Sequence, residues 1–188
     1  MNVLFIVGSA KKDGITAKLC DIASSSMKNE NVSFLYPIDM DISHCTGCNL
    51  CSTSGKCVID DDMDTIYKAV NDSDAVILAT PIHFSGPSSI LKQVIDRFQC
   101  VWLTDKGKAK DKVAGLIVNG GSPSPIFSNT VSIAKAFANT VGAEWIAELK
   151  AGDTDNITEI PEGLAAEAQG FGKRIIAAAS GTVSRKRP

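Results

Sequence analysis

The sequence lacks a long hydrophobic run, a strong net charge and a signal-like amino terminus. No apolar run approaches the roughly 20 residues that a bilayer-spanning helix needs, and the first residues carry no basic flank or cleavage site. We therefore expect a cytoplasmic protein with no membrane partner. A formal charge of −2 with interspersed signs also gives no electrostatic basis for binding nucleic acid.

The composition is that of one soluble globular domain, because 44% of the 188 residues are apolar and only 21% are charged. No linker or internal repeat divides the chain. We expect a single domain over residues 1–180 and a basic tail over residues 181–188, to which we assign no function. The polar stretch 103–112 is expected to be an exposed loop.

Short apolar runs alternate with amphipathic segments along the chain. Five runs are rich in β-branched residues, and most are apolar at adjacent positions, as strands buried on both faces are: Val3–Val7, Val32–Ile38, Ala75–Ala79, Val113–Val118 and Glu144–Leu149. Helical spacing predicts helices over Ala17–Met27, Met63–Val70, Ile90–Val101, Val131–Val141 and Pro161 to about Ala179. This alternation predicts an α/β three-layer sandwich around a five-stranded parallel sheet.

A loop rich in small and hydroxyl residues, GSAKKDGIT, follows the first apolar run and leads into a helix. Such a turn directs backbone N–H groups and a helix N-terminus at one point, which suits a phosphate monoester. We expect the Ser9 and Thr16 hydroxyls, with Lys11 or Lys12, to hold a single terminal phosphate. An ordinary tight turn between strand and helix is the alternative.

Two further loops follow the third and fourth apolar runs, over Thr80–Pro87 and Asn119–Pro125. Open α/β sheets place ligands at the carboxyl ends of their strands, where both loops belong. Backbone amides with Phe84 or His83 would frame a flat ring there. A phosphate cradle beside a ring slot describes a mononucleotide, and FMN is the mononucleotide that performs redox chemistry.

Four of the six cysteines are crowded in the pattern C-x2-C-x2-C-x5-C, at Cys45, Cys48, Cys51 and Cys57. One loop with this spacing can wrap a 4Fe-4S cluster, because each corner iron needs its own thiolate. Zinc is the first alternative, although zinc sites usually join two separated C-x2-C pairs; disulfides and free thiols are the others. Cys20 and Cys100 fall in helical patterns and are expected to be buried small residues.

The remaining charged groups have simple structural interpretations. Asp60, Asp61 and Asp62 precede a helix and are expected to cap it and complement its dipole. Lys92 and the pair Asp96–Arg97 have the spacing of an ordinary surface ion pair. No catalytic residue is assigned, and His83 is expected to be solvated.

Three segments resemble the iron-sulfur flavoprotein branch of the flavodoxin-like, NADPH-dependent FMN reductase superfamily. GSAKKDGITAKL is similar to GSPRxxGNTxxL, CTGCNLCSTSGKCVIDDDM to CxxCxxCx4-7CxxxDDM, and ATPIHFSGPSSILKQVIDR to sPvYfgxvsxxlKxfiDR. They span about the first half of the chain. The sequence departs from these patterns at Ala10-Lys11, where the family has Pro-Arg, at Ile15, where it has Asn, and at His83, where it has an aromatic residue.

The resemblance implies a flavodoxin-like sheet of order 2-1-3-4-5, one FMN per subunit, a 4Fe-4S cluster on the four cysteines, and homodimers or homotetramers. It places the phosphate contacts on Ser9, Lys11, Gly14, Ile15 and Thr16. It places the ring contacts on Pro81, Ile82, His83, Phe84, Ser85, Gly86, Asn119, Gly120, Gly121 and Ser122.

These features predict an FMN-dependent oxidoreductase that passes electrons from NAD(P)H or ferredoxin, by way of FMN and the cluster, to a quinone or another small acceptor. Strand spacing puts the cysteine loop about 10 Å from the third-strand loop. Three alternatives remain open: an NAD(P)H:quinone or FMN reductase without a cluster, a non-enzymatic electron carrier, and a dehydrogenase of a small organic molecule.

Overall fold

The computed structural model describes residues 1–104 and 112–186. Five parallel strands form the sheet in the order β2-β1-β3-β5-β6. They are β1 (Asn2–Val7), β2 (Asn31–Leu35), β3 (Ala75–His83), β5 (Lys112–Asn119) and β6 (Ala143–Ala151). The expected α/β sandwich and its 2-1-3-4-5 order are confirmed.

A sixth strand, β4 (Gly86–Pro87), is absent from the prediction. It pairs antiparallel with the end of β3, which continues four residues beyond the expected boundary. The apolar run ends at Ala79, so hydrophobicity alone gives no signal for this hairpin.

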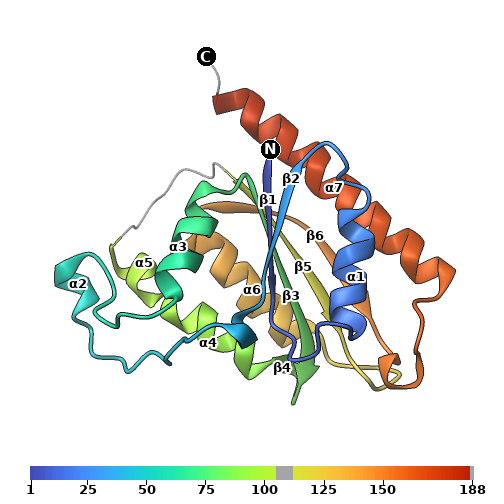
Figure 1. Cartoon of the computed structure of the whole chain (residues 1–188), viewed down its shortest axis with the longest axis horizontal. Helices are drawn as coiled ribbons and strands as arrows, with labels where there is room; N and C mark the ends of the chain where they lie inside the picture. The colour runs from blue at the N-terminus through green and yellow to red at the C-terminus, as the bar shows by residue number, and fades with distance from the viewer. Residues whose placement is uncertain (105–111, 187–188) are drawn as a thin grey trace.

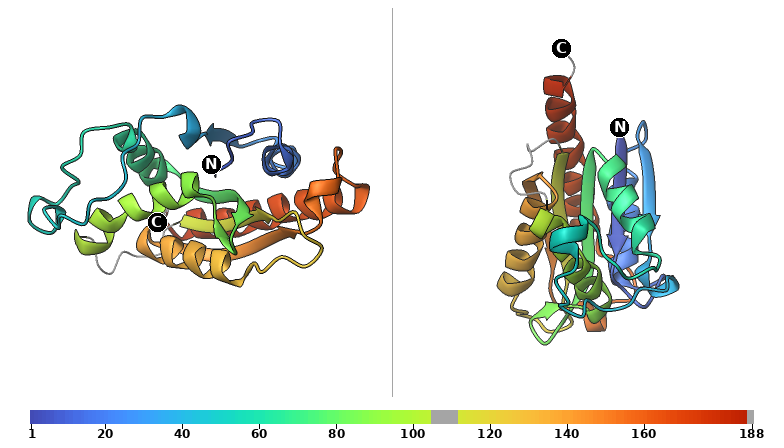
Figure 2. Two further views of the ribbon diagram at one scale, coloured as in Figure 1. Left: turned by 90° about the horizontal axis from the view of Figure 1, so that it is seen from below. Right: turned by 90° about the vertical axis from the view of Figure 1, so that its left-hand side faces the viewer.

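Helices cover both faces of the sheet, as the three layers in Figures 1 and 2 show. Alternate residues of β1 separate the two cores: Val3 and Phe5 pack on one side, and Leu4 and Ile6 on the other. The first core lies against α1 (Ile15–Ser24) and α7 (Glu162–Lys186). The second lies against α3 (Met63–Asp72), α4 (Ser89–Arg97) and α6 (Ser128–Thr140).

The expected helix Ile90–Val101 is two helices, α4 and α5 (Gln99–Thr104), which meet at Phe98. The Phe98 backbone has left the helical region, with ψ at 2°, and its ring packs edge-on against Tyr67 and Phe137. Three short elements complete the described chain: η1 (Pro37–Asp39), α2 (Cys51–Ser54) and η2 (Thr154–Asn156).

Two predictions concern the residues next to β5 and the carboxyl-terminal end of the chain. The prediction of an exposed loop over 103–112 is wrong at its described ends, because Leu103 and Thr104 belong to α5 and the buried Lys112 begins β5. The rest of that stretch lies outside the described residues. Helix α7 continues through Lys186, so residues 181–186 of the predicted tail are helical. Residues 187–188 lie outside the described residues. No helix in the described part of the chain is long and apolar enough to cross a bilayer.

Candidate cofactor sites

Two adjoining clefts lie at the carboxyl ends of β1, β3, β5 and β6. The first has a volume of about 670 Å³ and is lined by all five residues expected to contact phosphate: Ser9, Lys11, Gly14, Ile15 and Thr16. The second, of about 570 Å³, is lined by nine of the ten residues expected to contact the ring, all except Gly86, which forms β4. The clefts share the lining residues Pro81, His83, Asn119, Thr154 and Asp155. Both volumes are those of small-molecule sites.

The amino-terminal turn of α1 is open to a ligand. Gly14 caps the helix with an extended backbone and provides no side-chain hydrogen bond, so the first N–H groups have no partner within the helix or at its cap. The preceding loop is tightly folded, because the Ser9 hydroxyl donates to the Lys11 carbonyl at 3.1 Å and accepts from the Lys11 N–H at 3.2 Å. This geometry suits an anion such as a terminal phosphate.

The structure distinguishes the two adjacent lysines of this loop. Lys11 lines the first cleft. Lys12 pairs instead with the Asp39 carboxylate, and its ammonium lies 5.6 Å from the centre of the Tyr36 ring. Lys11 is therefore the loop cation available to a bound phosphate.

A buried hydrogen-bond chain joins the first turn of α1, the end of β5 and η2 around the clefts. The Thr16 hydroxyl donates to Asn119 Oδ1 at 2.6 Å, and Asn119 Nδ2 donates to Thr154 Oγ1 at 3.2 Å. The Thr16 hydroxyl proton is thus donated to Asn119, so Thr16 would contact a phosphate through its backbone N–H.

Sequence analysis missed the wall of the site contributed by the loop after β6. Thr154 and Asp155 line both clefts, but they belong to η2, whose residues match no recognised motif. The only available signal was their position after the last strand. The close approach depends on Gly121, because a Cβ there would lie 2.1 Å from the Asp155 carboxyl carbon.

The hairpin between β3 and β4 has a strained backbone. Phe84 and Ser85 have φ of 49° and 62°, and the flanking His83 and Gly86 pair directly. A two-residue connection with two positive φ angles matches the turn that normally takes Asn-Gly. The Phe84 side chain is fully exposed at the rim of the second cleft, near the exposed Ile126.

We expect Phe84→Gly to be about 1 kcal/mol more stable than Phe84→Ala, because glycine adopts positive φ without strain. Both variants lose the aromatic ring, so the difference between their stabilities in thermal unfolding measures the backbone strain alone. Titration of each variant with FMN reports the ring contribution, and both should bind FMN more weakly than the parent chain. Equal melting temperatures of the two variants would show that the backbone at position 84 is not strained.

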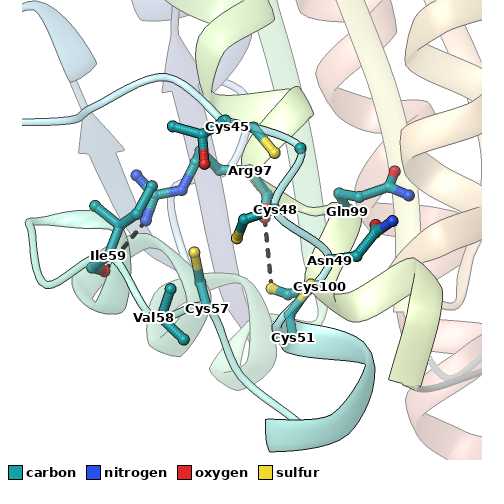
Figure 3. Close-up of a pocket in the computed structure, with 12 residues that line it drawn as sticks. Cys45, Cys48, Asn49, Cys51, Cys57, Val58, Ile59, Arg97, Gln99 and Cys100 are labelled. Atoms are coloured by element: carbon teal, nitrogen blue, oxygen red, sulfur yellow. Dashed lines mark hydrogen bonds between the residues drawn. The ribbon is translucent and has the colours of Figure 1, made fainter.

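The four clustered cysteines line a separate pocket, together with Arg97 and Cys100. Residues 41–49 have no regular structure, and α2 begins at Cys51. Figure 3 shows the loop folded over the junction of α4 and α5, with cysteine side chains on the inner side of the loop. Cys20 and Cys100 are buried, as expected, but Cys100 also adds a fifth thiol to this pocket.

Arg97 contradicts the expectation of a surface ion pair. Only 1% of its side chain is exposed, and it pairs with Asp61, which is 3% exposed. Asp61 therefore does more than cap α3, although its Oδ1 also accepts from the Met63 N–H at 3.0 Å. The expected surface pair on this helix is formed by Lys92 and Asp96 alone, at 2.7 Å. The error arose because the spacing along one helix does not show a partner from a distant loop.

The thiols of the cysteine loop differ in acidity. Hydrogen bonds from the Leu50 N–H and the Thr46 side chain lower the pKa of Cys48. Burial raises the pKa of Cys51, and the nearby Cys100, Cys57 and Cys48 thiols raise it further. Thiolates held so close together repel one another, so a bound cation would stabilise them.

The donor set of this pocket fits a metal centre, although its sulfurs do not surround one. Among the described residues, no group of three or more His, Cys, Asp or Glu side chains is arranged to hold a metal ion. The enclosed space measures about 20 Å³, enough for one water molecule. Binding a cluster would require the thiols to separate, which the exposed residues 46–50 allow.

The two sites are separate within one chain. The clefts at the strand ends and the cysteine pocket share no lining residue. Figure 1 shows α2 beside α5, on the opposite side of the molecule from the start of α1. The loop thus does not lie next to the end of the third strand, where strand spacing places it, because residues 41–50 run past α4 to reach α5.

Comparisons with known proteins identify a family and a shared fold. Residues 1–151 match the family described as NADPH-dependent FMN reductase. An iron-sulfur flavoprotein of Methanocaldococcus jannaschii is 34% identical over 124 residues, which are 65% of this chain and 63% of that protein. One from Archaeoglobus fulgidus is 37% identical over 99 residues, 52% of this chain and 45% of its own length. The chain thus matches less than two thirds of the length of each relative.

Solved structures share the fold. A flavone reductase superposes with a TM-score of 0.74 at 23% identity, covering 96% of this chain and 63% of that one. A flavodoxin, WrbA-like protein from Agrobacterium tumefaciens has a TM-score of 0.67 at 19% identity, covering 96% and 98%. At these identities the likeness establishes a flavodoxin-like architecture.

Proposed function

The chain belongs to the NADPH-dependent FMN reductase family of FMN-dependent oxidoreductases, and from that membership we propose that it passes electrons from a reduced donor, by way of FMN and a 4Fe-4S cluster, to a small acceptor. NAD(P)H or ferredoxin is the proposed donor, and a quinone or similar molecule the proposed acceptor. The observation that carries the proposal is the pair of sites in one chain: clefts at the strand ends, lined by the residues expected to contact phosphate and ring, and a four-cysteine pocket beside α5.

FMN would bind across the two adjoining clefts. Its phosphate would lie at the open first turn of α1, near Lys11, and its ring beside the loops that contain His83 and Gly120. When bound, the flavin supplies the conversion between two-electron and one-electron transfer. The exposed Phe84 and Ile126 at the cleft rim favour a flat, apolar acceptor at the ring.

Cys45, Cys48, Cys51 and Cys57 would hold the cluster, whose role is one-electron transfer. Because the cysteine pocket and the flavin clefts share no lining residue in one chain, we propose that electrons pass between them across the interface of a homodimer or homotetramer.

A reductase without a cluster is the second candidate. It is favoured by the small space between the thiols, about 20 Å³, and by the lack of a metal-holding arrangement among the described side chains. In that case the cysteines would hold zinc or remain free.

Anaerobic purification, with an absorption spectrum and quantified flavin, iron and sulfide on one sample, tests the proposal. Stoichiometric flavin with iron and sulfide supports the full electron path. Flavin without iron, together with rapid NAD(P)H oxidation in the presence of a quinone, selects the second candidate. A colourless chain that does not bind added FMN contradicts both.

Replacement of Lys11 by Gln is expected to weaken FMN binding about tenfold, because one charge-assisted phosphate contact is worth about 1.5–3 kcal/mol before solvent screening. Lys12→Gln is the matched control, since Lys12 pairs with Asp39 outside the cleft. Fluorescence titration with FMN at two salt concentrations measures both variants. Equal losses of affinity for the two lysines would contradict the assignment of Lys11.

A further inference from the structure

The Arg97 guanidinium has five N–H donors, and four of them have partners. One terminal nitrogen bonds Asp61 Oδ2 and donates to the Ser43 carbonyl at 2.8 Å. The other donates to Asp61 Oδ1 at 3.1 Å and to the Ile59 carbonyl at 3.4 Å. The fifth donor, Nε–H, is buried without any hydrogen-bond partner. An unmet buried donor costs about 1–3 kcal/mol, so its retention calls for an acceptor at this position.

The partners of Arg97 lie at both ends of the cysteine loop. Ser43 precedes the first cysteine by two residues, and Ile59 follows the last by two residues. The two ends are also joined directly, because the Ser43 N–H donates to Asp61 Oδ2 at 3.0 Å. One side chain from α4 thus closes the base of the loop, as Figure 3 shows for its contact with Ile59.

Arg97 itself lines the pocket that contains the four thiols. Sulfur is the abundant acceptor there, since Cys45, Cys48, Cys51, Cys57 and Cys100 all line the same space. The Cys100 thiol already donates to the Arg97 carbonyl, at 3.4 Å, so the backbone of Arg97 is also tied to this wall.

We propose that Arg97 is the positioning residue of the cysteine centre: its terminal nitrogens close the loop, and its Nε–H donates a hydrogen bond to a sulfur of the bound cluster or its thiolates. This inference rests on the proposed function, because it requires the cluster. Hydrogen bonds to the sulfurs stabilise the more negative, reduced state, and so they raise the reduction potential. Asp61 offsets much of the guanidinium charge, which leaves the directed N–H as the main influence of Arg97 on the potential.

The test compares Arg97→Lys with Lys92→Gln in anaerobically purified protein. Lysine keeps the positive charge but has no Nε–H and cannot pair in a fork with Asp61. Lys92 lies on the same helix in an exposed ion pair and does not line the pocket. We expect the one-electron reduction equilibrium of the Arg97→Lys cluster to fall about tenfold, which is about 59 mV in a redox titration, and that of Lys92→Gln to remain unchanged.

A second measurement leaves the side chain intact, in case Arg97→Lys does not fold. The parent protein is prepared with ¹⁵N-labelled arginine, and pulsed electron paramagnetic resonance of the reduced cluster detects coupling to an arginine nitrogen. Coupling supports the inference. An iron-loaded protein with no arginine coupling, or an iron-loaded Arg97→Lys variant with an unchanged potential, overturns it. Absence of iron and sulfide from the parent protein instead contradicts the proposed electron path, so the two failures are distinguishable.

The loop-closing role has a readout in metal-free protein. Lys56 lies within the cysteine loop, and its side chain is exposed. Trypsin should cleave after Lys56 faster in Arg97→Lys than in the parent, with no acceleration in Lys92→Gln. Equal cleavage rates in all three proteins would contradict a closing role for Arg97.

Discussion

Replacing Asp61 with alanine is expected to lower the free energy of unfolding by about 3–5 kcal/mol, because it leaves the buried Arg97 guanidinium without its counter-charge. Both side chains are at least 97% buried, and the pair spans 36 residues of sequence. Urea unfolding of metal-free protein, under conditions that keep the thiols reduced, measures the loss. The variant also loses the contact between Asp61 and the Ser43 N–H, which adds to the effect.

Asp96→Ala is the matched control, because Asp96 lies on the same helix as Arg97 in an exposed pair with Lys92. Such a pair contributes about 0.3–0.5 kcal/mol. A similar loss of stability in both variants would show that the Asp61–Arg97 pair is not buried in solution.

The same pair predicts how stability depends on acid. Burial alone would raise the pKa of Asp61, but hydrogen bonds from Arg97, Ser43 and Met63 outweigh burial and lower it. A carboxylate whose folded pKa is lowered stabilises the fold above its unfolded pKa, about 3.9, and loses this contribution as the pH falls through the lowered value. We therefore expect Asp61→Ala to reduce the acid sensitivity of unfolding below about pH 4.

Cys48→Ala is expected to remove most of the bound iron and sulfide and to leave the bound flavin in place. Cys48 is exposed, so its truncation should not disturb folding. A 4Fe-4S cluster needs four thiolates, and the pocket of Cys48 shares no residue with the flavin clefts. Iron, sulfide and flavin determinations on anaerobically purified protein measure the outcome.

Cys100→Ala tests the choice of ligands within the same pocket. Its thiol lies beside the other four but outside the C-x2-C-x2-C-x5-C pattern, and it donates to the Arg97 carbonyl. We expect this variant to retain its iron. If Cys100→Ala loses its iron and Cys48→Ala retains it, then Cys100 on α5 is a cluster ligand and Cys48 in the loop is not.

The sheet could be predicted from sequence because its strands are short apolar runs buried on both faces. Phe5 and Ile6 illustrate the signal: adjacent residues both lack exposed surface, because each faces a different helical layer. The phosphate loop could also be predicted, since its residues are consecutive in sequence and precede a helix. The β4 hairpin gave no such signal, because its backbone adopts positive φ at Phe84 and Ser85 instead of at glycine.

The residues that sequence analysis missed are fixed by distant partners. Arginine side chains usually lie at the protein surface, so the sequence gives no sign that Arg97 is buried. Its burial is favourable because Asp61 and two loop carbonyls pair with its guanidinium. Thr154 and Asp155 have no motif of their own, and Thr154 is held at the clefts by a hydrogen bond with Asn119, 35 residues earlier. Such contacts depend on tertiary structure, which local periodicity does not describe.

The hydrogen-bond chain from Thr16 through Asn119 to Thr154 has a consequence for the kinetics of cofactor uptake. Three walls of the cleft are joined by hydrogen bonds between side chains of this chain alone. The cleft then loses little conformational entropy when a nucleotide binds. We therefore expect one-step binding, with an observed rate that rises linearly with nucleotide concentration and no slow isomerisation phase.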